Sequence, residues 1–96
     1  MSTRDQILDT LREMHTELKG RYPIQRLALF GSWARGDARQ DSDVDVLVDV
    51  DPSIGLRFVQ LADEIEQGLG RRADVLSRRA IGPSLWKQIE PELIDA

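Results

Sequence analysis

The sequence predicts a small α+β fold (α/β in its alternation of elements), in which helices pack on one face of a small mixed β-sheet. Three short segments have the length and apolar content of strands: Ile24–Phe30, Asp43–Val50 and Ala73–Ser77. Segments with helical periodicity precede, separate and follow them, so the expected order is αββαβα. With 96 residues, the chain is expected to form a single domain, residues 1–96.

The first helix is predicted between Thr3 and Gly20. Thr3 and Gln6 have the spacing of a capping box at its start. His15, the only histidine, lies on the apolar face of this helix, and we expect it to pack there rather than act as a base. The other residues of that face follow at helical spacing: Ile7, Leu8, Leu11 and Leu18.

The next elements are two strands joined by a polar segment. Ile24–Phe30 is rich in apolar residues and stops at Gly31, after which WARGDARQDS indicates a short helical turn and a loop. Asp43–Val50 then alternates, so its valines are expected to face the core. Asp43 and Asp45 lie together on the opposite face.

The last three elements follow from periodicity and from prolines. A second long helix is predicted by Phe58, Ala62, Ile65 and Leu69 and is closed by Gly68 and Gly70. The strand Ala73–Ser77 comes next. Pro83 starts a final helix, and Pro91 ends it.

Composition excludes several classes of function. The net charge of −4 argues against non-specific binding of nucleic acid, which needs a basic face. The chain has no cysteine, so it has neither disulfides nor a thiolate metal site. No signal peptide or membrane span is apparent, and a cytoplasmic location is expected.

Asp43 and Asp45 are the leading candidates for a metal site. Neighbouring carboxylates repel each other, and a divalent cation with a preference for oxygen ligands, Mg²⁺ or Mn²⁺, would neutralise them. Asp74, on the other strand that carries an acid, is the candidate third carboxylate of a two-metal site. An amphipathic strand with one solvated face is the alternative. Asp41, Asp49 and Asp51 are expected to be ordinary surface charges.

Gly31 and Ser32 are the candidate phosphate-binding turn. Gly31 follows a strand and permits close approach of a ligand to the backbone, and Ser32 begins a helical turn with free N–H groups. Such a pair alone usually marks an ordinary turn; its specificity comes from Asp-x-Asp on the next strand. Trp33, the next residue, either lines the site or packs under the loop.

The segment GSWARGDARQDSDVDVLVD resembles the signature of the DNA polymerase β nucleotidyltransferase superfamily, in particular its minimal nucleotidyltransferase branch. The resemblance implies a polymerase β-like fold and Mg²⁺-dependent transfer of a nucleotide. Gly31 and Ser32 would hold the β- and γ-phosphates, Asp43 and Asp45 would bind two Mg²⁺ ions, and Asp74 would bind the ion that activates the attacking hydroxyl. Arg35, the signature arginine, contacts phosphate or forms a structural salt bridge.

The resemblance also implies a partner. Minimal nucleotidyltransferases of this size are commonly antitoxins of type VII pairs with HEPN ribonuclease toxins, which they silence by transferring AMP from ATP to a tyrosine hydroxyl. A hetero-oligomer with a HEPN toxin is therefore expected, with no direct contact to nucleic acid or membrane. Two alternatives are an antitoxin that acts by occlusion without catalysis, and a nucleotidyltransferase subunit that modifies a small molecule.

Overall fold

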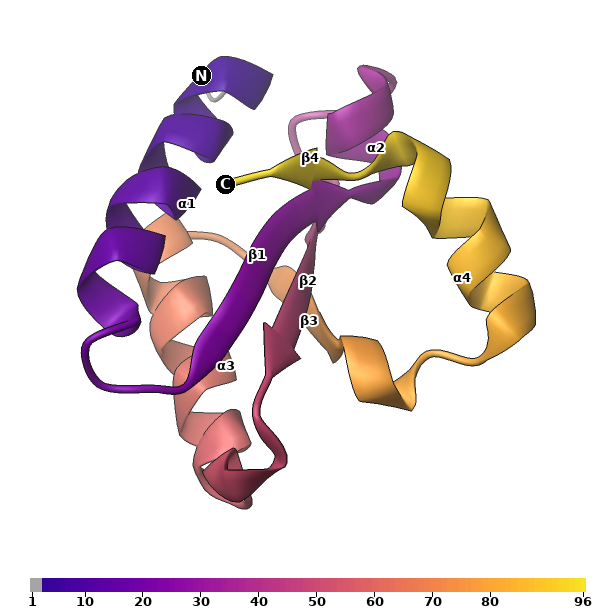
Figure 1. The fold of residues 1–96 in the computed structure, drawn as a ribbon. Helices are drawn as coiled ribbons and strands as arrows, with labels where there is room; N and C mark the ends of the chain where they lie inside the picture. Colours follow the sequence, from indigo (N-terminus) through magenta and orange to yellow (C-terminus); the bar gives the residue numbers. More distant parts are fainter. Residues whose placement is uncertain (1–2) are drawn as a thin grey trace.

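The computed structural model of the protein describes residues 3–96, and Figure 1 shows their arrangement. Helices and strands alternate along the chain. They are α1 (Arg4–Leu18), β1 (Ile24–Phe30), α2 (Gly31–Arg35), β2 (Val44–Val50), α3 (Arg57–Leu69), β3 (Ala73–Ser77), α4 (Pro83–Ile89) and β4 (Ile94–Asp95). Three 3-10 turns lie between them: η1 (Pro52–Ile54), η2 (Arg78–Ala80) and η3 (Glu90–Glu92).

The strands form one mixed sheet in the order β3–β2–β1–β4. β1 is antiparallel to both β2 and β4, whereas β2 and β3 are parallel. The predicted α+β fold with a mixed sheet is thereby confirmed. β4 was not expected from the sequence, because a strand of two residues has no periodicity; it forms because it pairs with Ala28 and Leu29 of β1.

The helices do not all pack on one face, and the prediction is corrected for the last of them. α1 and α3 lie on one side of the sheet, whereas α4 lies on the other (Figure 1). The reason is that the second face is also partly apolar and needs a cover. Its buried residues form a small separate cluster: Ala28, Phe30, Leu47, Ile81 and Ile89.

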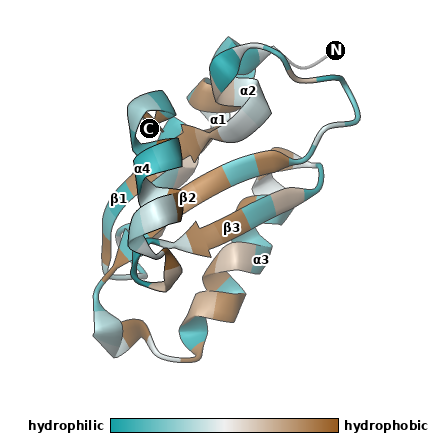
Figure 2. Ribbon diagram, turned by 90° about the vertical axis from the view of Figure 1, so that its right-hand side faces the viewer, coloured by the Kyte–Doolittle hydropathy of each residue, from teal (hydrophilic) through white to brown (hydrophobic). Residues whose placement is uncertain are grey.

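The main core lies between the sheet and the two long helices. Val44, Val46 and Val48 of β2 are fully buried there, as their alternation predicted, and Figure 2 shows the hydrophobic strands beside an amphipathic α3. The strand starts at Val44, so Asp43 stands just before it. No helix within residues 3–96 is long and apolar enough to cross a membrane.

The start of α1 and the packing of His15 also agree with the predictions from the sequence. Both bonds of the predicted capping box form: Thr3 accepts from the Gln6 N–H at 3.2 Å, and the Gln6 side chain accepts from the Thr3 N–H at 2.9 Å. His15 is half-buried, and its Nδ1 lies 2.9 Å from the carbonyl oxygen of Ala96. The histidine therefore packs against the C-terminal segment.

Candidate active site

The end of β1 brings Gly31 into contact with Asp45. Phe30 and Asp45 are register partners in the antiparallel pair β1–β2, and Gly31 follows at once with a φ of 77°. A Cβ atom at Gly31 would lie only 2.0 Å from Oδ2 of Asp45. This position therefore needs glycine for two reasons, the left-handed backbone and the adjacent carboxylate.

Three aspartates lie near one another where β2 and β3 begin. Asp45 and Asp74 are register partners in the parallel pair, so they share a face on adjacent strands, which lie about 4.8 Å apart. Asp43 precedes β2 and has the same parity as Asp45. Burial, and after it the negative charges of Asp74 and Asp43, raise the pKa of Asp45 to about 6.

These carboxylates fit divalent cations by their chemistry, although they do not form a closed ligand set. Among residues 3–96, no three metal-ligating side chains converge closely enough to hold an ion as they stand. The donors are hard oxygen atoms. The pKa of Asp45 is raised chiefly by burial and then by the charges of Asp74 and Asp43, which Arg35 offsets only in part. A cation with oxygen preference would relieve that repulsion and draw the three side chains together.

Trp33 and Arg71 fix the segment that leads into Asp43. The Trp33 side chain is buried, and its Nε1–H donates to the Ser42 carbonyl oxygen at 3.2 Å. The Arg71 guanidinium lies 4.8 Å from the centre of the Trp33 ring and donates to the carbonyl oxygens of Gln40 and Ser42. Of the two roles considered for Trp33, packing under the loop is therefore the one that the structure shows.

A groove of about 360 Å³ lies beside Gly31 and Asp45. Ser32 is half-buried and lines this groove, and no hydrogen bond from its hydroxyl is found within residues 3–96. The hydroxyl is therefore available to a ligand. Both the sheet and α4 contribute to the lining, which consists of Phe30, Gly31, Ser32, Arg35, Asp45, Gln88, Ile89 and Glu92.

Arg35 forms ion pairs rather than pointing freely into the groove. Its Nε lies 3.2 Å from Oδ2 of Asp37, and its Nη1 lies 3.1 Å from Oε2 of Glu92. These contacts are the structural salt bridge that the sequence left as one of two alternatives. A contact between Arg35 and phosphate remains a prediction.

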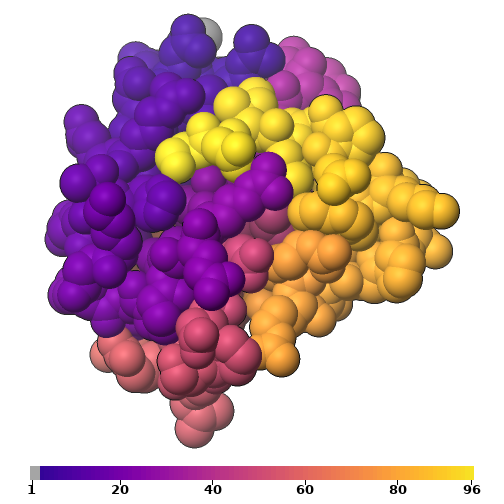
Figure 3. Space-filling model, in the orientation of Figure 1, coloured from indigo at the N-terminus to yellow at the C-terminus, as the bar shows by residue number. Residues whose placement is uncertain are grey.

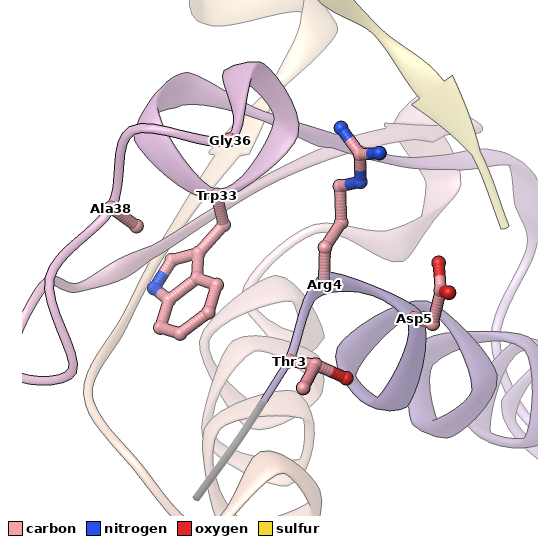
Figure 4. Close-up of a pocket in the computed structure, with 6 residues that line it drawn as sticks. All are labelled: Thr3, Arg4, Asp5, Trp33, Gly36 and Ala38. Carbon is pink, nitrogen blue, oxygen red and sulfur yellow. The ribbon is translucent and has the colours of Figure 1, made fainter.

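A second pocket, of about 340 Å³, lies on the α1 side of Trp33. Figure 4 shows its lining at the start of α1, with the Arg4 side chain extending toward α2. Arg4 donates to the Ala34 carbonyl oxygen at 3.0 Å, so it ties α1 to α2. The aspartates of the site do not line this pocket.

The comparison with known proteins agrees with this geometry. Residues 11–95 match the family described as "Nucleotidyltransferase domain". The chain belongs to this family. The protein adenylyltransferase MntA of Thermococcus cleftensis is 34% identical over 96 residues, which cover 98% of this chain and 96% of the relative. A Methanocaldococcus jannaschii protein assigned as an adenylyltransferase is 35% identical over 99 residues, with 98% of each chain covered.

Solved structures share the fold of this nucleotidyltransferase. A protein assigned as a minimal nucleotidyltransferase is 36% identical, with a TM-score of 0.78, and the match covers 97% of this chain and 95% of the other. A toxin–antitoxin complex solved with AMP-PNP gives a TM-score of 0.68 at 22% identity, covering 98% of this chain and 72% of the other. This second likeness shows the fold alone.

The structure therefore brings most of the residues that the sequence predicted for the site close to one another. Gly31, Ser32 and Asp45 border one groove, and Asp43 and Asp74 lie beside Asp45. Their roles toward metal and nucleotide remain predictions. Glu92 was missed, because an acidic residue after Pro91 has the pattern of an ordinary surface charge, and only its long-range contacts distinguish it.

Proposed function

We propose that this nucleotidyltransferase is an antitoxin that transfers AMP from ATP to a tyrosine hydroxyl of a HEPN-type ribonuclease toxin and thereby silences it. The observation that carries the proposal is the contact between Gly31 and Asp45, with Asp74 in register on the next strand. It joins a candidate phosphate turn and a candidate metal platform in one groove.

In this proposal, the three aspartates and Ser32 have definite roles. Asp43, Asp45 and Asp74 would hold two Mg²⁺ ions, which supply charge neutralisation and an activated hydroxyl. Ser32 would donate its hydroxyl hydrogen bond to the terminal phosphates of ATP. The tyrosine oxygen bonds to the α-phosphorus with loss of its proton, the bond from that phosphorus to the bridging oxygen breaks, and pyrophosphate leaves.

The choice of a protein as acceptor is supported by two relatives. A relative that matches nearly the whole chain is named protein adenylyltransferase MntA. A second, more distant chain of the same fold was solved in a complex called the toxin–antitoxin MntA–HpeT, with a TM-score of 0.70 at 20% identity. The HEPN class of the toxin and the tyrosine acceptor follow from the resemblance to minimal nucleotidyltransferases.

The proposal is tested by incubating the purified protein and its partner toxin with ATP and Mg²⁺. We expect the intact mass of the toxin to rise by one or more AMP units on a tyrosine. Asp43→Ala combined with Asp45→Ala should lower the rate by at least about 100-fold, because charge stabilisation by the metals is lost.

A matched control replaces two other aspartates of the same segment. Asp41→Ala combined with Asp49→Ala removes the same charge from residues outside the proposed metal set and should leave the rate nearly unchanged. If the Asp43/Asp45 variant still modifies the toxin, the assigned site is wrong. If it neutralises the toxin at wild-type potency without modifying it, the antitoxin acts by occlusion.

A further inference from the structure

Glu92 reaches into the groove from the C-terminal segment and contacts both ends of α2. Its Oε1 accepts a hydrogen bond from the Gly31 N–H at 3.0 Å, and its Oε2 accepts one from Nη1 of Arg35 at 3.1 Å. The Glu92 side chain is only 18% exposed. One carboxylate therefore bridges the first and the last residue of this short helix.

The fold holds Glu92 in this place from both sides. Before it, Ile89 is buried against the second face of the sheet. After it, Ile94 pairs with Leu29 in the antiparallel pair β1–β4, so the segment is anchored one residue before the end of β1. The space-filling view shows the C-terminal residues packed between α1 and the region of α2 (Figure 3). Glu92 is consequently a fixed part of the groove.

The position of Glu92 is electrostatically unfavourable for ionised Asp45. Its charge adds to the burial and to the charges of Asp74 and Asp43 that already oppose ionisation of Asp45. A fourth carboxylate in an acidic groove is stabilised here by its two donors, the Gly31 N–H and Arg35. The contacts to α2 are thus the feature that explains why an acid lies at this point.

We propose that Glu92 is a positioning residue for nucleotide transfer, which holds the turn at Gly31 and Ser32 in its binding geometry. This inference rests on the proposed function of the same groove. Because the Gly31 N–H is already donated to Glu92, phosphate contacts of the turn come from Ser32. Gly31 contributes by its missing side chain, which leaves room for Asp45. The essential contact is the hydrogen bond to the Gly31 N–H.

Three variants of Glu92 test this. Glu92→Gln keeps an oxygen that accepts from the Gly31 N–H but loses the ion pair with Arg35. Glu92→Ala removes both contacts, and Glu92→Met removes both while filling nearly the same volume, which keeps the variant informative if Ala does not fold. Glu90→Gln, an exposed residue of the same 3-10 turn, is the matched control.

Two measurements are made on each variant: the Kd of Mg·ATP without the partner, and the chemical shift of the Gly31 amide proton in NMR spectra. We expect Glu92→Ala and Glu92→Met to weaken Mg·ATP binding by about 10-fold or more, the size of effect found for residues that orient ligands of a site. Their Gly31 amide signal should move upfield, because its hydrogen bond is lost. Glu92→Gln should keep the wild-type shift and bind within about 3-fold of wild type.

Other outcomes overturn the proposal. Tighter Mg·ATP binding in all three variants would mean that Glu92 competes with phosphate. Equal losses in Glu92→Gln and Glu92→Met would assign the effect to the ion pair with Arg35, and no loss in any variant would make Glu92 a surface charge. A wild-type protein that binds Mg·ATP but does not modify its partner contradicts the proposed function alone, since neither measurement uses the partner.

Discussion

Asp45→Asn is expected to raise the melting temperature of the metal-free protein by about 5–10 °C near pH 8, while nucleotide transfer is lost. The pKa of Asp45 is raised from 3.8 to about 6, chiefly by burial and then by Asp74 and Asp43. Keeping this carboxylate ionised in the folded protein therefore costs free energy. Because Asp45 is only half-buried, we expect a gain in the free energy of unfolding of about 1–2 kcal/mol, below the full value for such a shift.

The sign of the pH dependence follows from the direction of this shift. Below about pH 4 the carboxyl is protonated in both the folded and the unfolded chain, so Asp45 contributes no difference. Between about pH 4 and 6 only the folded chain retains the proton, and the contribution of Asp45 to stability falls as the pH rises. The advantage of Asp45→Asn should therefore shrink toward about pH 4 and reach its full size above about pH 7.

Thermal unfolding in EDTA at the two ends of this pH range checks the prediction. Asp49→Asn, on the same strand but at the other end from Asp74, is the control and should leave the melting temperature nearly unchanged. Mg²⁺ should raise the melting temperature of the wild type more than that of Asp45→Asn. An Asp45→Asn variant that is less stable than the wild type near pH 8 in EDTA contradicts the account of charge accumulation at the site.

Gly31→Ala is expected to abolish binding of Mg·ATP and to destabilise the protein by about 2–4 kcal/mol. Alanine at a φ of 77° is strained, and its Cβ would lie 2.0 Å from Oδ2 of Asp45. Either the aspartate or the turn must move, and both belong to the proposed site. The free energy of unfolding, from urea titration, and the Kd of Mg·ATP measure the two effects.

Gly70→Ala separates backbone strain from the contact with Asp45. Gly70 has a φ of 67°, close to that of Gly31, yet a Cβ there would have no atom within 4 Å. We expect a loss of only about 1–2 kcal/mol, from strain alone, with Mg·ATP binding unchanged. Equal losses of stability in Gly31→Ala and Gly70→Ala, with binding intact in both, would show that the approach of Gly31 to Asp45 has no functional role.

The sequence was most informative where local pattern decides structure. The alternation from Asp43 to Val50 placed the valines in the core and grouped Asp43 with Asp45, and the spacing of Thr3 and Gln6 fixed the start of α1. Asp74 was correctly placed beside Asp45, because Ala73–Ser77 was the only other predicted strand with an acidic residue.

Long-range contacts were not predictable in this way. β4 has two residues and exists only through its pairing with β1. The face of the sheet on which α4 packs depends on the apolar patch around Leu47, which alternation alone did not predict. The contact between Glu92 and Gly31 joins residues 61 positions apart, and no local sequence pattern predicts it.

The most direct test of the central claim, that this groove is a two-metal nucleotide site, is anomalous diffraction from crystals of the protein with Mn²⁺ and AMP-PNP. We expect anomalous peaks for two ions about 4 Å apart between Asp43, Asp45 and Asp74, with the terminal phosphates beside Ser32. Ions bound elsewhere, or a triphosphate that lies away from Ser32, would contradict it.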